Sequence, residues 1–288
     1  MNQERRLIVV SGISGAGKTV VLNTLEDLSF YAIDNLPVSL LNELIEQFSE
    51  ENNTLPKHIA IGIDARNSLE DFSFLPETIK KLEDKNIRSE LIFIEANDDV
   101  LTRRFSETRR KHPLSSETVS LSDAIQQERD IIGALAEASD LRIDTSYMQL
   151  HELRNIVRQR IDQRKDTKLS LQFMSFGFKN GLPKDADFVF DLRCLPNPYW
   201  NKDLRKYSGK DQPVIEFLSK QNDAIEMMND LEQFLKRWIP SFEADNRSYL
   251  SIAFGCTGGH HRSVFIVEQL AKKFNDSEKQ VMIRHRDL

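Results

Sequence analysis

A glycine-rich stretch near the N-terminus constrains the fold of this chain more than any other part of the sequence. Residues 12–19 fit the pattern G-x-x-x-x-G-K-[ST] at every fixed position. The apolar run 7–10 before it predicts a buried strand, and the amphipathic run 20–25 after it predicts a helix. A strand, a loop and a helix in this order predict a phosphate-binding loop rather than a chance glycine-rich turn.

Each part of this loop has a chemical reason to bind phosphate. Glycine lets backbone N–H groups approach phosphate oxygens without interference from Cβ atoms, and the start of the helix adds a positive dipole end. We expect Lys18, also a candidate catalytic residue, to reach the β- and γ-phosphates and Thr19 to bind Mg²⁺. The expected nucleotide-binding residues of the loop are Gly12, Ile13, Ser14, Gly15, Ala16, Gly17, Lys18 and Thr19.

Length and composition restrict the class of protein. A chain of 288 residues exceeds the usual ~100–200 residues of one domain, so two domains are expected. The net charge of −6 gives no bulk attraction for nucleic acid, and no apolar run approaches the ~18 residues of a membrane span. Two cysteines exclude a disulfide framework, and residues 1–6 leave no room for a secretory signal, so we expect a cytoplasmic protein.

The first half of the chain alternates apolar runs with helical periodicity, which is typical of a doubly wound parallel sheet. The predicted strands after the first are residues 30–33, 59–63, 91–94 and 141–143. A polar, charged stretch at 164–168 then marks a boundary. We therefore divide the chain into a nucleotide-binding domain, residues 1–166, and a second domain, residues 167–288. The predicted fold class of the first is α/β, a kinase-like P-loop NTPase.

Acidic residues follow predicted strands of this sheet, at the edge where open α/β sheets bind ligands, and three of them are candidate site residues. Asp64 is the preferred Walker B residue, a carboxylate that holds Mg²⁺, and Glu95 competes for the same role. Thr19 and Asp64 are therefore the expected metal ligands. Asp34 is either a substrate base or a turn residue ahead of Pro37.

A basic cluster follows the fourth predicted strand. In P-loop kinases, a mobile lid at this point in the sheet order supplies arginines that stabilise charge on the transferred phosphoryl group. A solvated helix face explains any single arginine more simply, whereas the cluster as a whole favours a lid. We name Arg103 and Arg104 as candidate catalytic residues of a cluster that comprises Arg103, Arg104, Arg109, Arg110, Lys111 and His112.

The second half of the chain predicts a further set of strands and helices. The expected strands are residues 169–178, 188–193 and 249–254, and one helical region is expected at 214–238. The loop 196–200 combines two prolines and an asparagine with two aromatic residues. That composition is typical of a rigid ligand rim and equally of plain turn chemistry.

A second strand, glycine loop and helix begin at residue 249. The loop, 255–263, contains Cys-x₅-Arg-Ser, which matches cysteine-dependent phosphatases, where a thiolate attacks phosphorus and an arginine holds two oxygens. Because no convincing general acid is evident, we favour anion binding over phosphatase chemistry or a structural turn around a buried cysteine. The candidate anion site comprises Cys256, Thr257, Gly258, Gly259, His261, Arg262, Ser263, Arg193 and Asn197.

These motifs together resemble one family. The combination resembles the RapZ/YvcJ family of bacterial nucleotide-binding proteins and extends over nearly the whole chain. Many families share the phosphate loop, whereas the C-terminal motifs in this order are hard to find elsewhere. The stretches that carry the resemblance are residues 12–19, 34–37, 64–67, 112–114, 175–179, 195–198 and 255–263.

The resemblance implies ATP and GTP binding with slow hydrolysis, and homo-oligomers. It implies a C-terminal domain similar to the sugar-phosphate-binding domains of phosphofructokinases, which in some members senses an amino-sugar phosphate. Some members are RNase adapters, so a small RNA and a ribonuclease are implied partners. The implied guanine-nucleotide contact consists of Asp64, Ala65, Arg66 and Asn67.

Two features depart from the family pattern. RNA-binding members can carry a tail rich in lysine and arginine, whereas this sequence stops at residues 284–288, which we expect to weaken an adapter role. Tyr199 stands where relatives can carry histidine, which bears on the identity of the sensed ligand.

We therefore interpret the sequence as a nucleotide-binding regulatory protein. A P-loop ATPase and GTPase domain that uses ATP, GTP and Mg²⁺ is joined to a domain that senses a phosphorylated metabolite. The alternatives are an RNA-binding adapter and a small-molecule kinase in which Asp34 is the substrate base.

Overall fold

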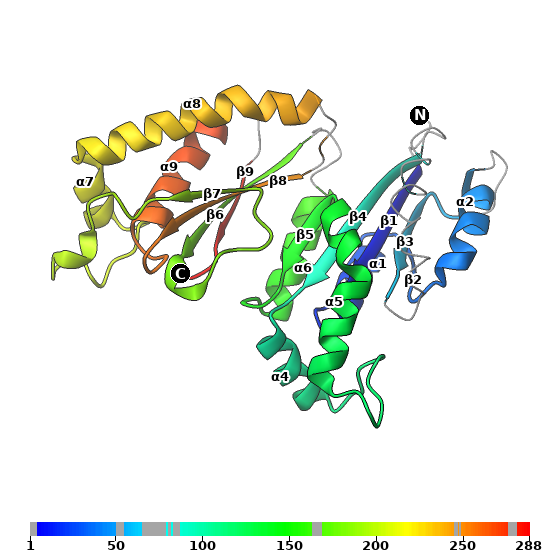
Figure 1. Cartoon of the computed structure of the whole chain (residues 1–288). Helices are drawn as coiled ribbons and strands as arrows, with labels where there is room; N and C mark the ends of the chain where they lie inside the picture. The colour runs from blue at the N-terminus through cyan, green and yellow to red at the C-terminus, as the bar shows by residue number, and fades with distance from the viewer. Residues whose placement is uncertain are drawn as a thin grey trace. The chain divides into compact units, whose positions relative to one another are not determined.

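The computed structural model describes residues 5–49, 55–64, 79, 82, 87–162, 169–244, 247, 249–275 and 281–288. Contacts within the chain divide it into two compact units, Met1–Asp162 and Gln163–Leu288. Each unit is an α/β structure built around its own parallel sheet (Figure 1). In the part of the chain that is described, no helix is long and apolar enough to cross a membrane.

The sheet of the first unit has the strand order β2–β3–β1–β4–β5, and each pair is parallel. This order places β1, which leads into the phosphate loop, at the centre of the sheet. The doubly wound parallel sheet predicted from the sequence is therefore confirmed. The strands are β1 (Arg5–Gly12), β2 (Tyr31–Ile33), β3 (His58–Gly62), β4 (Ile87–Glu95) and β5 (Leu141–Asp144).

The helices of the first unit cover both faces of this sheet. Figure 1 shows α5 in front of the sheet and α1 behind it, and α1 packs against α6. The N-terminus of α5 is capped by Ser120, whose side chain accepts a hydrogen bond from the Asp123 N–H. The helices are α1 (Lys18–Asp27), α2 (Leu41–Ser49, after the short 3₁₀ helix Val38–Leu40), α4 (Asp98–Thr108), α5 (Leu121–Ala138) and α6 (Leu150–Asp162).

The central strand is buried on both faces, as a parallel sheet between two helix layers requires. Its apolar run 7–10 has almost no exposed surface. At the end of β1, Gly12 has a φ of 142°. A Cβ built there would collide with the carbonyl group of Ile94 in β4. Only glycine therefore allows β1 and β4 to approach this closely where the phosphate loop begins.

The sheet of the second unit has four parallel strands in the order β7–β8–β6–β9. In its core, Phe173 packs edge to face against Phe254 and Phe274. The strands are β6 (Ser170–Gly177), β7 (Phe188–Asp191), β8 (Tyr249–Cys256) and β9 (Val281–His285). The helices are α7 (Gln212–Ser219), α8 (Asn222–Ala244) and α9 (Arg262–Asn275), with short 3₁₀ helices at Phe178–Asn180 and Pro198–Trp200.

Two elements of the second unit differ from the sequence expectation. The helical region predicted at 214–238 is two helices, α7 and α8, which are separated at residues 220–221. No glycine or proline lies at this break, so the sequence carries no local signal for it. The second difference is β9, which we did not predict, because its apolar run is only three residues long before Arg284.

The close approach of β1 and β4 yields a stability prediction. Gly12→Ala is expected to lower the free energy of unfolding by at least about 2 kcal/mol, because it combines an unfavourable φ with a backbone collision. Gly133→Ala is the matched control: Gly133 lies within α5, a Cβ there meets no atom within 4 Å, and alanine is expected to stabilise the helix by about 0.5–1 kcal/mol. Urea unfolding of both variants measures the two changes. Equal effects would contradict the proposed constraint.

Candidate functional site

A cavity of about 690 Å³ lies over the phosphate loop of the first unit. It lies beyond the carboxyl ends of the strands, where parallel α/β sheets bind ligands. It contains most of the loop together with residues from the ends of α4 and β5. Its lining residues are Ser14, Gly15, Ala16, Gly17, Lys18, Thr19, Val20, Asp34, Asp64, Arg104, Phe105, Glu107, Thr108, Arg110, Lys111, Pro113, Thr145, Met148, Gln149, Leu150 and Leu153.

The phosphate loop has the backbone conformation that its glycines permit. Gly15 and Gly17 have φ values of 83° and 120°, in the region that side chains disfavour. The Ile13 N–H donates to the Ile94 carbonyl at 2.9 Å, which ties the loop to β4. The Lys18 ammonium donates to the Gly12 carbonyl at 2.5 Å. The charge of Lys18 is therefore held within the loop, at the floor of the cavity.

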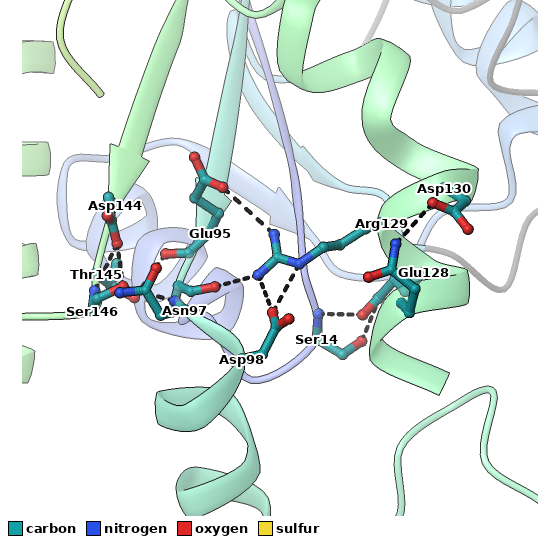
Figure 2. Close-up of polar contacts among 12 residues, drawn as sticks. Ser14, Glu95, Asn97, Asp98, Glu128, Arg129, Asp130, Asp144, Thr145 and Ser146 are labelled. Atoms are coloured by element: carbon teal, nitrogen blue, oxygen red, sulfur yellow. Dashed lines mark hydrogen bonds and ion pairs between the residues drawn. The ribbon is translucent and has the colours of Figure 1, made fainter. Parts of the chain in front are cut away.

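The two carboxylates considered for the Walker B role lie in different environments. Asp64 lines the cavity together with Thr19, so a hydroxyl and a carboxylate, both oxygen ligands that suit Mg²⁺, lie in one cavity. Glu95 is buried away from the cavity, where it forms ion pairs with Arg142 and with Arg129, the latter at 3.6 Å. Figure 2 shows Glu95 directed at Arg129, which also contacts Asp98.

Asp34 lines the same cavity as Asp64. A Cβ at Gly62 would lie 2.8 Å from Asp34 Oδ1, so the absence of a side chain at Gly62 leaves room for this carboxylate.

The predicted guanine contact at Ala65, Arg66 and Asn67 lies outside the described residues. No group of three or more histidine, cysteine, aspartate or glutamate side chains in the described ranges is arranged to hold a metal ion by itself. A metal at Thr19 and Asp64 would therefore also need oxygen ligands from the nucleotide.

Some members of the basic cluster line the cavity, and others do not. Arg104 lines the cavity, and the hydrogen bonds that fix it include those to the Gly15 carbonyl at 3.1 Å, to Thr145 Oγ1 at 3.0 Å and to the Thr145 carbonyl at 2.8 Å. Burial lowers the pKa of Arg104, and the neighbouring Arg103 adds to the effect. Arg103 itself is exposed and does not line the cavity. Of the two predicted catalytic arginines, only Arg104 therefore lies beside the loop.

A buried glutamate that the sequence analysis did not select holds the first turn of the loop. Glu128 of α5 accepts hydrogen bonds from Ser14, through the backbone N–H at 2.8 Å and the hydroxyl at 2.7 Å (Figure 2). His112 Nε2 lies 3.0 Å from the same carboxylate. Burial alone would raise the pKa of Glu128, but His112, the charge of Lys18 and the Ser14 donors outweigh it and lower the pKa. Glu128 is therefore a buried carboxylate anion.

A sequence signal for Glu128 exists. Its position falls on the apolar face of α5, whose buried residues recur at intervals of three and four, and a glutamate on such a face needs a partner. The buried residues of this helix are Ala124, Ile125, Glu128, Ile132 and Leu135.

The second glycine loop begins at the end of β8, and residues 257–261 join β8 to α9 in the second unit. Cys256 is buried, and its Sγ lies 3.2 Å from the Ser263 hydroxyl. Burial alone would raise the pKa of the Cys256 thiol, but the Ser263 hydroxyl, the N–H groups of Ser263 and Gly259 and the charge of Arg262 outweigh it and lower the pKa. This loop therefore stabilises negative charge at the sulfur.

Arg262 has structural partners as well as a position in the loop. Its Nη1 donates to the carbonyls of Arg193 and Leu195 at 2.9 and 3.0 Å, and its Nη2 donates to Thr257 Oγ1 at 3.2 Å. Within the described residues, its buried Nε has no hydrogen-bond partner, and neither has the buried Nε2 of His261. Burial, followed by the nearby His260, lowers the pKa of His261. The Nε of Arg262 is therefore a buried donor at this loop that can bind an anion.

Two predicted members of the anion site have other contacts. The Arg193 guanidinium pairs with Asp191 at 2.7 Å and lies 4.0 Å from the centre of the Phe178 ring. Asn197 Oδ1 accepts a hydrogen bond from the Tyr199 N–H at 3.2 Å and caps the short helix Pro198–Trp200. The backbone carbonyl of Arg193 thus accepts a hydrogen bond from Arg262 of the loop, whereas the Asn197 side chain stabilises its own turn.

The central β1, the glycine loop and the cavity above it define the first unit as a P-loop nucleotide-binding domain. The chain belongs to the RapZ family: residues 5–165 match the RapZ-like N-terminal domain, and residues 169–288 match the RapZ C-terminal domain.

Relatives match along the whole chain. A nucleotide-binding protein from Pseudomonas putida strain GB-1 is 47% identical over 283 residues, which are 98% of this chain and 100% of the relative. A nucleotide-binding protein from Cellvibrio japonicus strain Ueda107 is 47% identical over 282 residues, which are 98% of this chain and 95% of the relative. This chain is a nucleotide-binding protein of the RapZ family.

Solved structures of kinases also align with part of the chain. Shikimate kinase from Acinetobacter baumannii in complex with shikimate aligns with a TM-score of 0.39 at 16% identity, over 57% of this chain and 96% of that one. A gluconokinase from Sinorhizobium meliloti 1021 aligns with a TM-score of 0.36 at 15% identity, over 54% and 91% of the two chains.

The different surroundings of Asp64 and Glu95 give a prediction for the metal. Asp64→Asn is expected to raise the Mg²⁺ concentration for half-maximal nucleotide binding by about 10-fold or more, because a charged ligand is lost. Glu95→Gln is expected to leave this concentration unchanged and to lower the melting temperature, because two arginines lose a buried partner. Magnesium titrations with a fluorescent nucleotide, beside thermal unfolding, measure both. The opposite ranking would assign the metal to Glu95.

Proposed function

We propose that this protein is a slow ATPase and GTPase whose second unit binds a phosphorylated sugar. The observation that supports the hydrolase part is one cavity lined by Lys18, Thr19, Asp64 and Arg104. Together these side chains supply two cations, a hydroxyl and a carboxylate above the phosphate loop. Phosphoryl transfer depends mainly on positioning and charge stabilisation, which are what such a set provides.

At the phosphate end, each side chain has a distinct role. Lys18 binds the β- and γ-phosphates, for which it leaves the Gly12 carbonyl. Thr19 and Asp64 would hold Mg²⁺, which stabilises negative charge on the phosphates when bound. Arg104, fixed by Gly15 and Thr145, keeps a positive charge beside the loop without further ordering. The charge stabilisation is therefore largely preorganised.

Other residues that line the cavity are suited to a nucleobase. Met148, Leu150 and Leu153 supply apolar surface, and Gln149 supplies an amide that can hydrogen-bond to a base edge. Leu153 lies close to Gly17, so this apolar wall begins directly beside the phosphate loop. The arrangement accommodates either purine, so we propose that ATP and GTP compete for one site.

Lys18→Ala is expected to reduce kcat for ATP and GTP by about 10²–10³-fold, because a charge on the β- and γ-phosphates is lost. The fold is expected to persist, since the residue lies at the floor of an open cavity. Lys202→Ala, which removes an exposed lysine of the second unit, is the matched control and is expected to hydrolyse normally. Phosphate release by purified protein measures the effect. Normal hydrolysis by Lys18→Ala would refute this catalytic site.

The second part of the proposal rests on the loop that follows β8. A phosphate group there would meet the loop amides, and it offers an acceptor for the buried Nε of Arg262. The lowered pKa of Cys256 also supports a loop that favours negative charge. We propose that the ligand is a phosphorylated sugar, as the family resemblance implies, and that it is bound without a reaction.

Arg262→Ala is expected to cost about 1.5–3 kcal/mol of sugar-phosphate binding, the usual contribution of a hydrogen bond to a charged group. Cys256→Ser is expected to bind normally, because the amides and the guanidinium hold the ligand. Calorimetry with a panel of sugar phosphates measures binding, and Arg237→Ala, which removes an exposed arginine of α8, is the comparison variant. Unchanged affinity in Arg262→Ala would refute the anion site.

A phosphatase would behave differently in the same experiment. The lowered thiol pKa favours a thiolate nucleophile, and Cys256→Ser would then abolish phosphate release while sugar-phosphate binding survives. Phosphate release that depends on Cys256 would therefore replace passive binding as the function of this loop.

One exposed surface supports the adapter alternative. Trp200 is 80% exposed, and the Arg205 guanidinium lies 4.8 Å from the centre of the Tyr199 ring. Exposed aromatic and basic side chains are what single-stranded RNA stacks on and pairs with. Gentle purification tests this alternative. Retained RNA and a retained ribonuclease, together with the oligomeric state of that complex, would distinguish an adapter from a metabolite sensor.

Turnover that requires an added hydroxyl acceptor would instead indicate a kinase with Asp34 as base.

A further inference from the structure

The segment between α4 and α5, residues 109–120, contributes residues to two environments. Arg110, Lys111 and Pro113 line the cavity above the phosphate loop. His112 lies between them in sequence and is buried, with only 2% of its surface exposed. A single turn of chain therefore directs two cationic residues at the cavity and one imidazole into the interior.

The buried imidazole has a defined hydrogen-bonding state. His112 Nδ1 accepts a hydrogen bond from the Leu114 N–H at 3.2 Å. Nε2 therefore carries the proton of a neutral ring and donates it to the Glu128 carboxylate at 3.0 Å. The ring also packs against Phe105, with 5.2 Å between centroids, and the Ser115 hydroxyl donates to the His112 carbonyl at 2.8 Å. The turn is thus fixed at several atoms.

Glu128 connects this turn to the phosphate loop. The same carboxylate accepts the backbone N–H and the hydroxyl of Ser14, so it holds the first turn of the loop and the basic segment at once. All of these groups are buried, so water does not compete for the contacts. A shift of His112 would move Arg110 and Lys111, its immediate neighbours, relative to the phosphate loop.

We propose that His112 and Glu128 are positioning residues for the bound nucleotide: by joining the basic segment to Ser14, they hold Arg110 and Lys111 against the nucleotide phosphates. The inference rests on the proposed binding of ATP or GTP in this cavity. Neither residue touches the nucleotide; each acts through side chains that do. This role predicts coupling between His112 and the two cations, which a purely structural contact would not show.

A double-mutant cycle tests the coupling. His112→Ala is expected to weaken binding of a fluorescent ATP analogue by about 10-fold in the otherwise unchanged protein. In the Arg110→Ala/Lys111→Ala background, the same substitution is expected to change the affinity by less than about 2-fold, because the side chains through which His112 acts are gone. Equal losses in the two backgrounds would overturn the inference.

Controls separate this role from damage to the fold and from failure of the proposed function. Glu117→Gln changes an exposed charge in the same segment, outside the cavity, and is expected to bind normally. If His112→Ala melts below the assay temperature, His112→Phe keeps the packing against Phe105, removes the donor and takes its place in the cycle. An unchanged protein that binds no nucleotide would overturn the proposed function and this inference together; binding that His112 does not affect would overturn the inference alone.

Discussion

The close approach of two backbones at the end of β1 is the constraint on which the nucleotide site depends. Gly12 lies against Ile94 of β4, and the phosphate loop begins at that point. The loop is fixed there by the hydrogen bond from the Ile13 N–H to the Ile94 carbonyl. The loop in turn directs Lys18 and Thr19 into the cavity and presents Ser14 to Glu128. The site is therefore built from the centre of the sheet outward, and its geometry is set where the strands pack most tightly.

The sequence was sufficient for those parts of the molecule in which local pattern and tertiary fold agree. Apolar runs bounded by a glycine loop and an amphipathic helix predicted the parallel sheet of the first unit, because burial on both faces leaves few polar residues in such strands. The presence of Asp34 and Asp64 at one cavity follows from the rule that parallel strands end at the same edge. Their chemical roles, and that of Arg104, stay predictions.

Other parts depended on contacts between residues distant in sequence. The position of Glu128 on the apolar face of α5 signals a buried partner, but the sequence does not identify Ser14, more than a hundred positions away, as that partner. Arg262 was expected to face an anion, but the structure also uses it to hold the carbonyls of Arg193 and Leu195. The strand β9 has little apolar sequence of its own and depends on pairing with β6. Such features depend on residues that meet only in the folded structure, and hydrophobic periodicity in the sequence does not predict these contacts.

The placement of the aromatic residues has a spectroscopic consequence. The chain has two tryptophans, Trp200 and Trp238, and both lie in the second unit, 80% and 43% exposed. The nucleotide cavity lies wholly in the first unit, which contains no tryptophan. Intrinsic tryptophan emission is thus a native reporter of the second unit alone, and a change in it when a nucleotide occupies the first unit would be an optical signature of communication between the two.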